Sequence, residues 1–130
     1  MINRKNKRTA RIGIFAVAHA TYWAQFDGLL DNIMGYHHEF TAMVEAKDVE
    51  VVDFGMVDSS EKAFEAVKAI KAADVDLLMC NMVTYATSSV FAPIIRDANV
   101  PMILVALQPL SKLDYTKANT FMQLENDNIC

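Results

Sequence analysis

The sequence has few of the residues that stabilise small secreted proteins. It contains two cysteines among 130 residues, and one of them, Cys130, is the last residue. Cys80 lies inside an apolar run, so the pair predicts neither a disulfide framework nor a cysteine metal site. We therefore expect a cytoplasmic protein with Cys80 in its core.

Long apolar runs are also missing. None approaches the ~18 residues that a membrane span needs, so no membrane partner is expected. The apolar stretch Ile12–Ala18 follows a basic start, as in a signal peptide. It is short and β-branched and leads directly into a helical pattern, which favours a buried strand instead.

Positive charge is scarce as well. The chain has 12 Lys and Arg against 16 Asp and Glu, a formal net charge of -4, which argues against a nucleic-acid partner. The basic run Asn3–Arg8 is an exception, but it is short and contains no aromatic residue. We interpret residues 1–10 as a flexible, solvated leader.

Several ligand-binding motifs are absent. The chain contains no GxGxxG and no GxxxxGK[ST] sequence, so the common phosphate-binding loops are excluded. No aspartate ends the first or third predicted strand, which speaks against a phospho-receiver domain. No carboxylate pair stands at the strand ends, so no divalent metal is expected to bind this chain.

What the sequence does contain is a regular alternation of strand and helix patterns in one domain, residues 11–110. The predicted strands are Ile12–Ala18, Val49–Phe54, Val75–Met82 and Val100–Leu107. The predicted helices are Gln25–Glu45, a helix from the capping-box sequence Asp58–Glu61 to Ala72, and one from Thr87 or Ser88 to Ala98. After Leu110 no period is visible, and residues 111–130 look like the start of a connection to a following domain, as if the chain were truncated.

Apolar residues at helical spacing predict the buried face of each helix. These residues are Phe26, Leu29, Leu30, Ile33, Phe40, Met43 and Val44; Ala63, Phe64, Val67 and Ile70; and Val90, Phe91, Ile94 and Ile95. Gly35 allows a bend in the long helix, and Pro93 requires its helix to start late or to kink. The pair His37–His38 does not share a helix face and cannot chelate one metal, so both are expected to be partly exposed.

Alternating strands and helices predict an α/β fold, an open flavodoxin-like parallel sheet of order 2-1-3-4 with helices on both faces. In such sheets ligands bind where the strand order reverses, outside the carboxyl ends of the strands. Here this switch point lies between the first and third strands, so the turns 19–23 and 81–85 are expected to meet there, with Gln108 nearby.

The residues of these turns suit a neutral polyol. Tyr22 and Trp23 offer aromatic faces for a sugar ring, His19 can bond a hydroxyl, and the next turn offers an amide and hydroxyls at Asn81, Thr84 and Tyr85. The alternatives are structural. His19 would then bond only the neighbouring backbone, the aromatic side chains would cap the core, and the polar groups would serve the loop alone.

Four separated stretches resemble one family. They are residues 12–29 with Ile12–Phe15 and Thr21–Trp23, Val52–Ala66, Asp74–Pro109 with its core Thr84–Ser89, and Leu113–Cys130. Together they resemble the opening of the L-arabinose isomerase-like branch of the L-fucose/L-arabinose isomerase superfamily. The resemblance extends over Arg11–Cys130 and rests on the ordered set, because no single motif is decisive.

The resemblance implies the N-terminal domain of an aldose–ketose isomerase that uses Mn²⁺ or a related divalent cation. In that family two glutamates and two histidines of later domains hold the metal, and this chain has none of those positions. The domain would cover the sugar site of a neighbouring subunit in a trimer or hexamer, and would be inactive alone. The turn after the first strand, including Thr21, would reach the sugar.

Two questions stay open within this interpretation. Arabinose isomerases carry a glutamine where this chain places His19, so the sugar is not specified. A second hypothesis is a non-enzymatic sugar-binding module, one lobe of a periplasmic- or repressor-type binding domain, because its strands have the same character.

Overall fold

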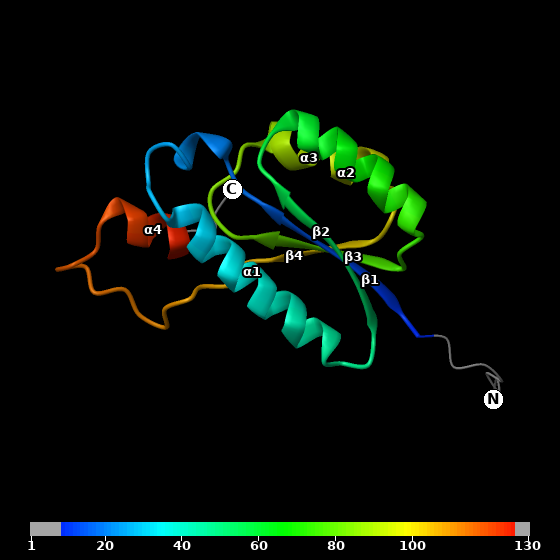
Figure 1. Cartoon of the computed structure of the whole chain (residues 1–130), viewed down its shortest axis with the longest axis horizontal. Coiled ribbons are helices and arrows are strands. Elements are labelled where there is room, and N and C mark those ends of the chain that lie inside the picture. The colour runs from blue at the N-terminus through cyan, green and yellow to red at the C-terminus, as the bar shows by residue number, and fades with distance from the viewer. Residues whose placement is uncertain (1–8, 127–130) are drawn as a thin grey trace.

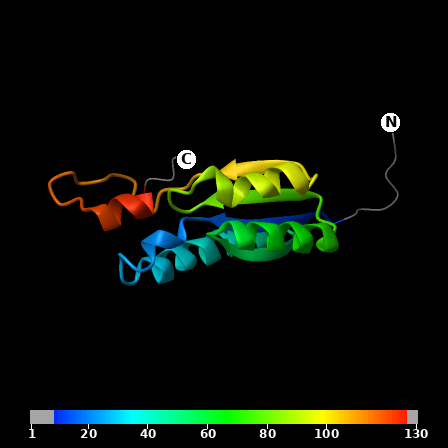
Figure 2. The same ribbon diagram turned by 90° about the horizontal axis from the view of Figure 1, so that it is seen from above.

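A computed structural model describes residues 9–126, which form a parallel sheet with helices on both faces (Figure 1). Its strands are β1 (Arg11–Val17), β2 (Glu50–Val57), β3 (Leu77–Met82) and β4 (Met102–Val105). They pair in the order β2-β1-β3-β4, and Figure 2 shows them side by side from above. The predicted flavodoxin-like α/β fold and strand order are therefore confirmed. Residues 1–8 of the predicted leader, and Cys130, lie outside the described residues.

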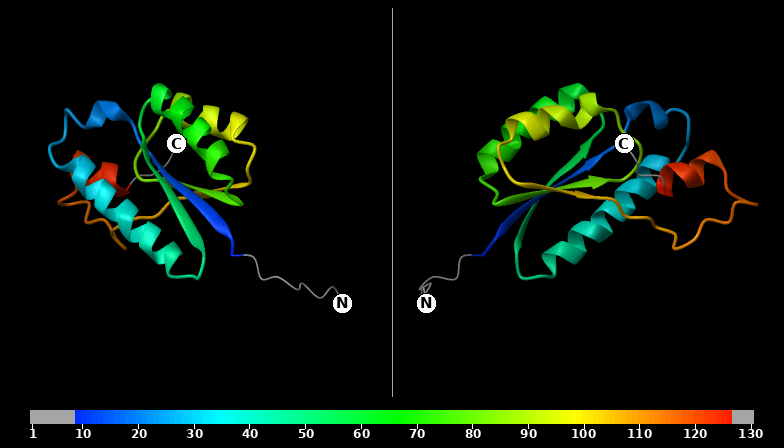
Figure 3. Two further views of the ribbon diagram at one scale, coloured as in Figure 1. Left: turned by 45° about the vertical axis from the view of Figure 1, so that its right-hand side comes forward. Right: turned by 180° about the vertical axis from the view of Figure 1, so that it is seen from behind.

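The helices divide between the two faces of the sheet, as Figure 3 shows from two sides. They are α1 (Leu29–Glu45), α2 (Ser60–Ala73), α3 (Ser88–Asp97) and α4 (Thr120–Asn126). α2 and α3 pack together on one face, whereas α1 covers the other face with α4 beside its N-terminal end. Within residues 9–126, no helix combines the length and apolar character that crossing a membrane requires.

β1 lies at the centre of the core because its alternate side chains serve both faces. Phe15 and Val17 pack in the cluster under α2 and α3, and Ala16 belongs to the cluster under α1. Gly13 marks a close approach within the sheet: a Cβ there would lie 2.7 Å from side-chain atoms of both Leu78 and Phe54. Only glycine fits this position without displacing its neighbours.

β2 is longer than the prediction, which ended it at Phe54. The strand continues to Val57 through a β-bulge opposite β1, where the register shifts between Ile14 and Ala16. Gly55 adopts φ +73° in this bulge, and its N–H donates to Asp53 Oδ1 at 2.8 Å. Gly55 is therefore the residue that lets the strand bend and continue beyond Phe54.

The turn after β1 delays α1, which the prediction began at Gln25. Ala20–Tyr22 form a single 3-10 turn, and α1 begins only after Gly28, whose φ of +81° ends the turn region. The predicted capping box is shifted by one residue: Ser59, not Asp58, caps α2 by accepting the Lys62 N–H at 3.3 Å. α3 continues through Pro93, which is buried.

Three residues predicted to face inward are exposed instead: Met43 at 57%, Phe64 at 51% and Ile95 at 52%. They lie at the margins of apolar stripes that are wider than the surface each helix buries. α4 was not predicted either, because seven residues are too few to show a helical period. It packs through Phe121, whose ring lies 6.5 Å from that of Phe26.

Candidate functional site

The carboxyl ends of β1 and β3 bring part of the predicted site together. The His19 and Tyr22 rings meet edge to face with centroids 5.6 Å apart. Burial, and then the neighbouring phenol of Tyr85, raise the pKa of Tyr22 above its usual value of 10.0. We name His19, Tyr22 and Tyr85 the switch-point cluster. The two tyrosines carry neutral hydroxyl groups that both donate and accept hydrogen bonds.

Next to this cluster, the side chain of Trp23 is held in place by a hydrogen bond. Its indole Nε1–H donates to Asp58 Oδ2 at 2.8 Å, and Lys62 Nζ forms an ion pair with Asp58 Oδ1 at 2.7 Å. These contacts fasten the turn after β1 to the start of α2. Thr21 is exposed, and its carbonyl accepts the Gln25 side-chain amide at 2.9 Å. Contacts of Thr21 or Trp23 with a ligand stay a prediction.

Thr84 follows β3 in the chain and is fully buried. Among the described residues, its Oγ1 has no hydrogen-bond partner. A buried hydroxyl without a partner costs about 1–3 kcal/mol, so native proteins rarely retain one without a reason. Thr84 is therefore the least satisfied polar group at this end of the sheet.

A buried hydrogen-bonded chain crosses from α1 to the sheet. His37 has no exposed surface, its Nε2 lies 2.9 Å from Asp53 Oδ1, and its Nδ1 lies 3.2 Å from Asn81 Nδ2. The prediction of a partly exposed His37 is therefore wrong, although His38 is exposed as expected. His37 follows Leu29 and Ile33 at intervals of four residues, which places all three on the face that α1 buries.

The carboxylate of Asp53 determines which groups donate and which accept in this series of hydrogen bonds. A carboxylate only accepts hydrogen bonds, so neutral His37 carries its proton on Nε2 and accepts at Nδ1. Asn81 must then present its NH₂ group to His37. Burial raises the pKa of Asp53, but hydrogen bonds from His37 and the Gly55 N–H, and the nearby histidines, outweigh burial and hold that pKa below its usual value.

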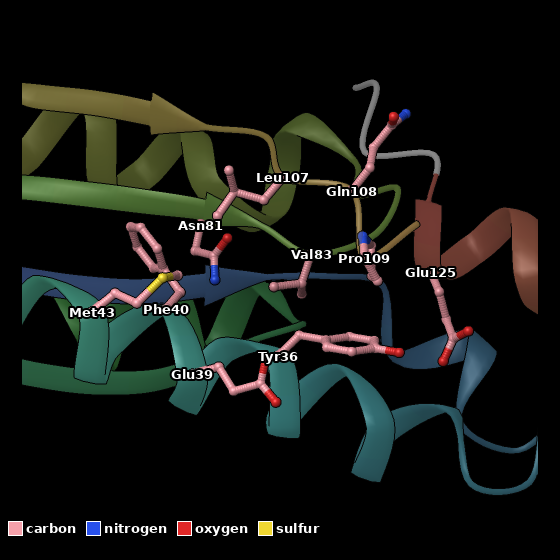
Figure 4. Close-up of a pocket in the computed structure, with 10 residues that line it drawn as sticks. All are labelled: Tyr36, Glu39, Phe40, Met43, Asn81, Val83, Leu107, Gln108, Pro109 and Glu125. Atoms are coloured by element: carbon pink, nitrogen blue, oxygen red, sulfur yellow. The ribbon is translucent and has the colours of Figure 1, made fainter. Parts of the chain in front are cut away.

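Asn81 also lines a cavity between α1, the carboxyl ends of β3 and β4, and α4. We name this cavity the α1 pocket; Figure 4 labels the residues that line it. Its volume is about 240 Å³. Of the eight predicted site residues, Asn81 and Gln108 line it, and Gln108 Nε2 donates to the Asn126 carbonyl at 3.0 Å. The other six do not line it.

No metal site is formed by this part of the chain. Within residues 9–126, no group of three or more His, Cys, Asp or Glu side chains converges to hold an ion. The described residues therefore do not provide the group of ligands that Mn²⁺ needs, and we assign no reaction step to a metal bound by them. What the described residues offer is hydrogen bonding and an aromatic surface.

Sequence reasoning missed His37, Asp53, Tyr36 and Glu39. A signal existed for His37, because its spacing from Ile33 puts it on the buried stripe. Asp53 interrupts an apolar strand, which is a second signal of a buried or paired carboxylate. Their pairing across 16 residues has no sequence signature.

Comparison with protein-family models gives no match for this chain. A search of the curated proteins finds no similar protein either.

Proposed function

We propose that this chain is the N-terminal domain of a cytoplasmic, metal-dependent aldose–ketose isomerase and that the switch-point cluster contacts the sugar. One observation carries the proposal: the turns after β1 and β3 meet at the reversal of strand order and present His19, Tyr22 and Tyr85 together. Neutral hydroxyl and imidazole groups match the alternating donors and acceptors of a sugar. The isomerase chemistry itself rests on the family resemblance.

In this proposal the chain binds and orients, and it does not catalyse alone. The aromatic rings of the cluster cover the apolar face of the sugar, and His19 and the tyrosine hydroxyls bond its hydroxyl groups. The divalent cation would polarise the sugar carbonyl from a site made by other domains. The cluster would complete that site in a trimer or hexamer.

The test is an isomerase assay on the gene product that contains this chain. Mn²⁺ is added and removed with a chelator, and ketose formation is measured with L-arabinose, L-fucose, D-arabinose and other aldoses. Metal-dependent ketose formation supports the proposal and names the sugar. Sugar binding without turnover of any aldose would support the non-enzymatic binding module instead.

Two variants and a control test whether the turns after β1 and β3 contact the sugar. His19→Ala is expected to raise KM or lower kcat by roughly three- to tenfold, since one hydrogen bond contributes about 0.5–1.5 kcal/mol. Thr84→Val removes the buried hydroxyl, and weaker sugar binding without lower stability would give that hydroxyl a ligand partner. His38→Ala, an exposed histidine on α1, is the matched control and should behave as wild type.

Wild-type kinetics in His19→Ala would remove His19 from the sugar site. Unfolding curves for each variant separate lost contact from lost structure. A variant with unchanged stability and altered KM reports on binding alone.

A further inference from the structure

The α1 pocket is separate from the switch-point cluster, and its chemistry differs. We propose that the α1 pocket binds a small primary amine whose apolar body ends in a hydrogen-bond donor, as in a hydroxyaryl-alkylamine. This ligand is neither a sugar nor a metal, so the inference stands apart from the proposed isomerase function. Three features of the pocket support it: its walls, the acceptor at one end and the charge at the other.

The walls of the pocket are mainly apolar. Phe40 and Met43 of α1 face Val83 and Leu107 across the cavity (Figure 4). A cavity of about 150 Å³ suffices to hold benzene. At about 240 Å³, the α1 pocket has room for an aromatic ring and a short chain. Such walls favour an apolar body over a polyol, whose hydroxyl groups would lose their hydrogen bonds there.

One end of the pocket presents a fixed hydrogen-bond acceptor. Asn81 is only 3% exposed, and Asp53 and His37 together orient its NH₂ group toward α1. Its Oδ1 therefore points the other way, into the cavity, as Figure 4 shows. A ligand hydroxyl can donate to this oxygen, because an amide oxygen has two lone pairs that accept hydrogen bonds.

The other end of the pocket is negative. Glu125 lies there beside Tyr36, at the far end from Asn81, whereas Glu39 lines the pocket from α1, between Met43 and Tyr36 (Figure 4). Burial, followed by the charges of Glu125 and Glu39, raises the pKa of Tyr36 above 10.0. Asn32 Nδ2 donates to Glu125 Oε1 at 2.9 Å, which holds this carboxylate in place.

The charge selects among ligands of similar shape. Among the described residues, no Lys, Arg or His side chain lines the α1 pocket. A carboxylate or phosphate would therefore meet only like charge, whereas an ammonium group is attracted by the negative charges of Glu125 and Glu39. Two carboxylates do not make a metal site, and no third ligand joins them in the described part of the chain.

The experiment is an NMR titration of the whole chain with tyramine. The side-chain amide of Asn81 and the backbone amide of Val83 report binding. Two matched ligands separate the contributions of the hydroxyl and the ammonium group to binding. Phenethylamine lacks the hydroxyl, and 3-(4-hydroxyphenyl)propionate has a carboxylate in place of the ammonium. We expect saturable shifts with tyramine, roughly fivefold weaker binding of phenethylamine, and no binding of the propionate.

Two surface variants avoid the risk of unfolding that a change at Asn81 carries. Glu39→Gln and Glu125→Gln are each expected to weaken tyramine binding roughly two- to fivefold. Glu65→Gln, on the exposed side of α2, should leave it unchanged. Absence of tyramine-induced shifts, or equal binding of the propionate, would overturn the proposal. Equal binding of phenethylamine would overturn the part assigned to Asn81.

Because this titration contains no sugar and no metal, it is independent of the isomerase assay. Failure of one therefore does not affect the other.

Discussion

β1 and β4 are apolar strands of one sheet, yet they lie in opposite surroundings. From Ile12 to Val17 every residue of β1 is buried, whereas no residue of β4 is. Ile103 and Leu104 of β4 are 46% and 56% exposed. β1 has a paired strand on each side and helices over both faces, while β4 has a described neighbour only in β3. Position in the sheet, rather than composition, sets how much each strand contributes to stability.

The exposed apolar surface continues beyond β4. Leu107 and Leu110 are 47% and 42% exposed in the segment that leads to α4. Large contiguous apolar patches on a protein surface commonly mark places where another domain or subunit packs. The edge at β4 is therefore a surface on which another domain or subunit could pack.

The largest difference in stability is expected when one apolar side chain on each of the two strands is shortened to alanine. Phe15→Ala on β1 is expected to lower the free energy of unfolding by about 3–5 kcal/mol, because it leaves a cavity in a closed core. Leu104→Ala on β4 should cost less than about 1 kcal/mol, since water already reaches the side chain. Urea denaturation measures both. Similar losses would mean that β4 is covered in solution.

A second test compares adding a methyl group in the core and on the surface. Gly13→Ala is expected to destabilise the protein by about 1–3 kcal/mol, because the new Cβ lies 2.7 Å from Leu78 and Phe54. Gly35→Ala in α1 meets no atom within 4 Å and should stabilise by up to about 1 kcal/mol through helix propensity. Thermal unfolding of the two variants should therefore shift in opposite directions. A shift of the same sign in both would contradict the packing around Gly13.

The hydrogen bonds that join Asp53, His37 and Asn81 make a prediction about how stability depends on pH. Asp53 has a folded-state pKa below the usual 3.8, so its hydrogen bonds stabilise the fold fully above that value. This contribution disappears as the pH falls through the lower folded-state pKa. Asp53→Asn should therefore lose less stability between about pH 5 and pH 2 than wild type. Asp27→Asn, at an exposed turn residue, is the control. Parallel pH curves for wild type and Asp53→Asn would show that Asp53 is not the group responsible.

The last test changes the edge itself, where only a small effect on stability is expected. Replacing both Ile103 and Leu104 with lysine should change the free energy of unfolding by only about 1 kcal/mol, since both sites are exposed. It should reduce self-association, because charged residues block edge-to-edge pairing. Light scattering over a concentration series measures this. Phe64→Lys on α2 is the matched control. Equal self-association of the wild type, the double lysine variant and this control would show that the β4 edge has no role in assembly.

The order of the elements could be predicted from local patterns. β1, the centre of α1 and the cores of α2 and α3 follow from hydrophobic periods that need no knowledge of distant residues. The boundaries were less accurate, since the second strand was predicted to end at Phe54 but continues through a bulge to Val57. The short helix α4 contacts Phe26 and Asn32, which lie far from it in the sequence. Because these distant contacts stabilise it, its helical structure could not be predicted from its own residues.

The candidate site divides in the same way. The strand order placed the turns after β1 and β3 together, and the structure brings His19 and Tyr22 into contact near Tyr85. The α1 pocket was not predicted, because it depends on where α1 and α4 settle on the sheet. Cavities arise from packing between elements, and no local pattern specifies their shape.

The sequence alone determined that strands and helices alternate, that the sheet is parallel and that its order reverses between β1 and β3. These properties follow from side-chain periodicity and from the handedness of crossover connections. Only the tertiary structure decided that β4 is exposed and that His37 is buried between Asp53 and Asn81. His37 lies 16 residues from Asp53 and 44 from Asn81 in the chain. Contacts over such separations form when α1 docks on the sheet, because burial leaves polar groups to find partners among whatever residues packing brings near.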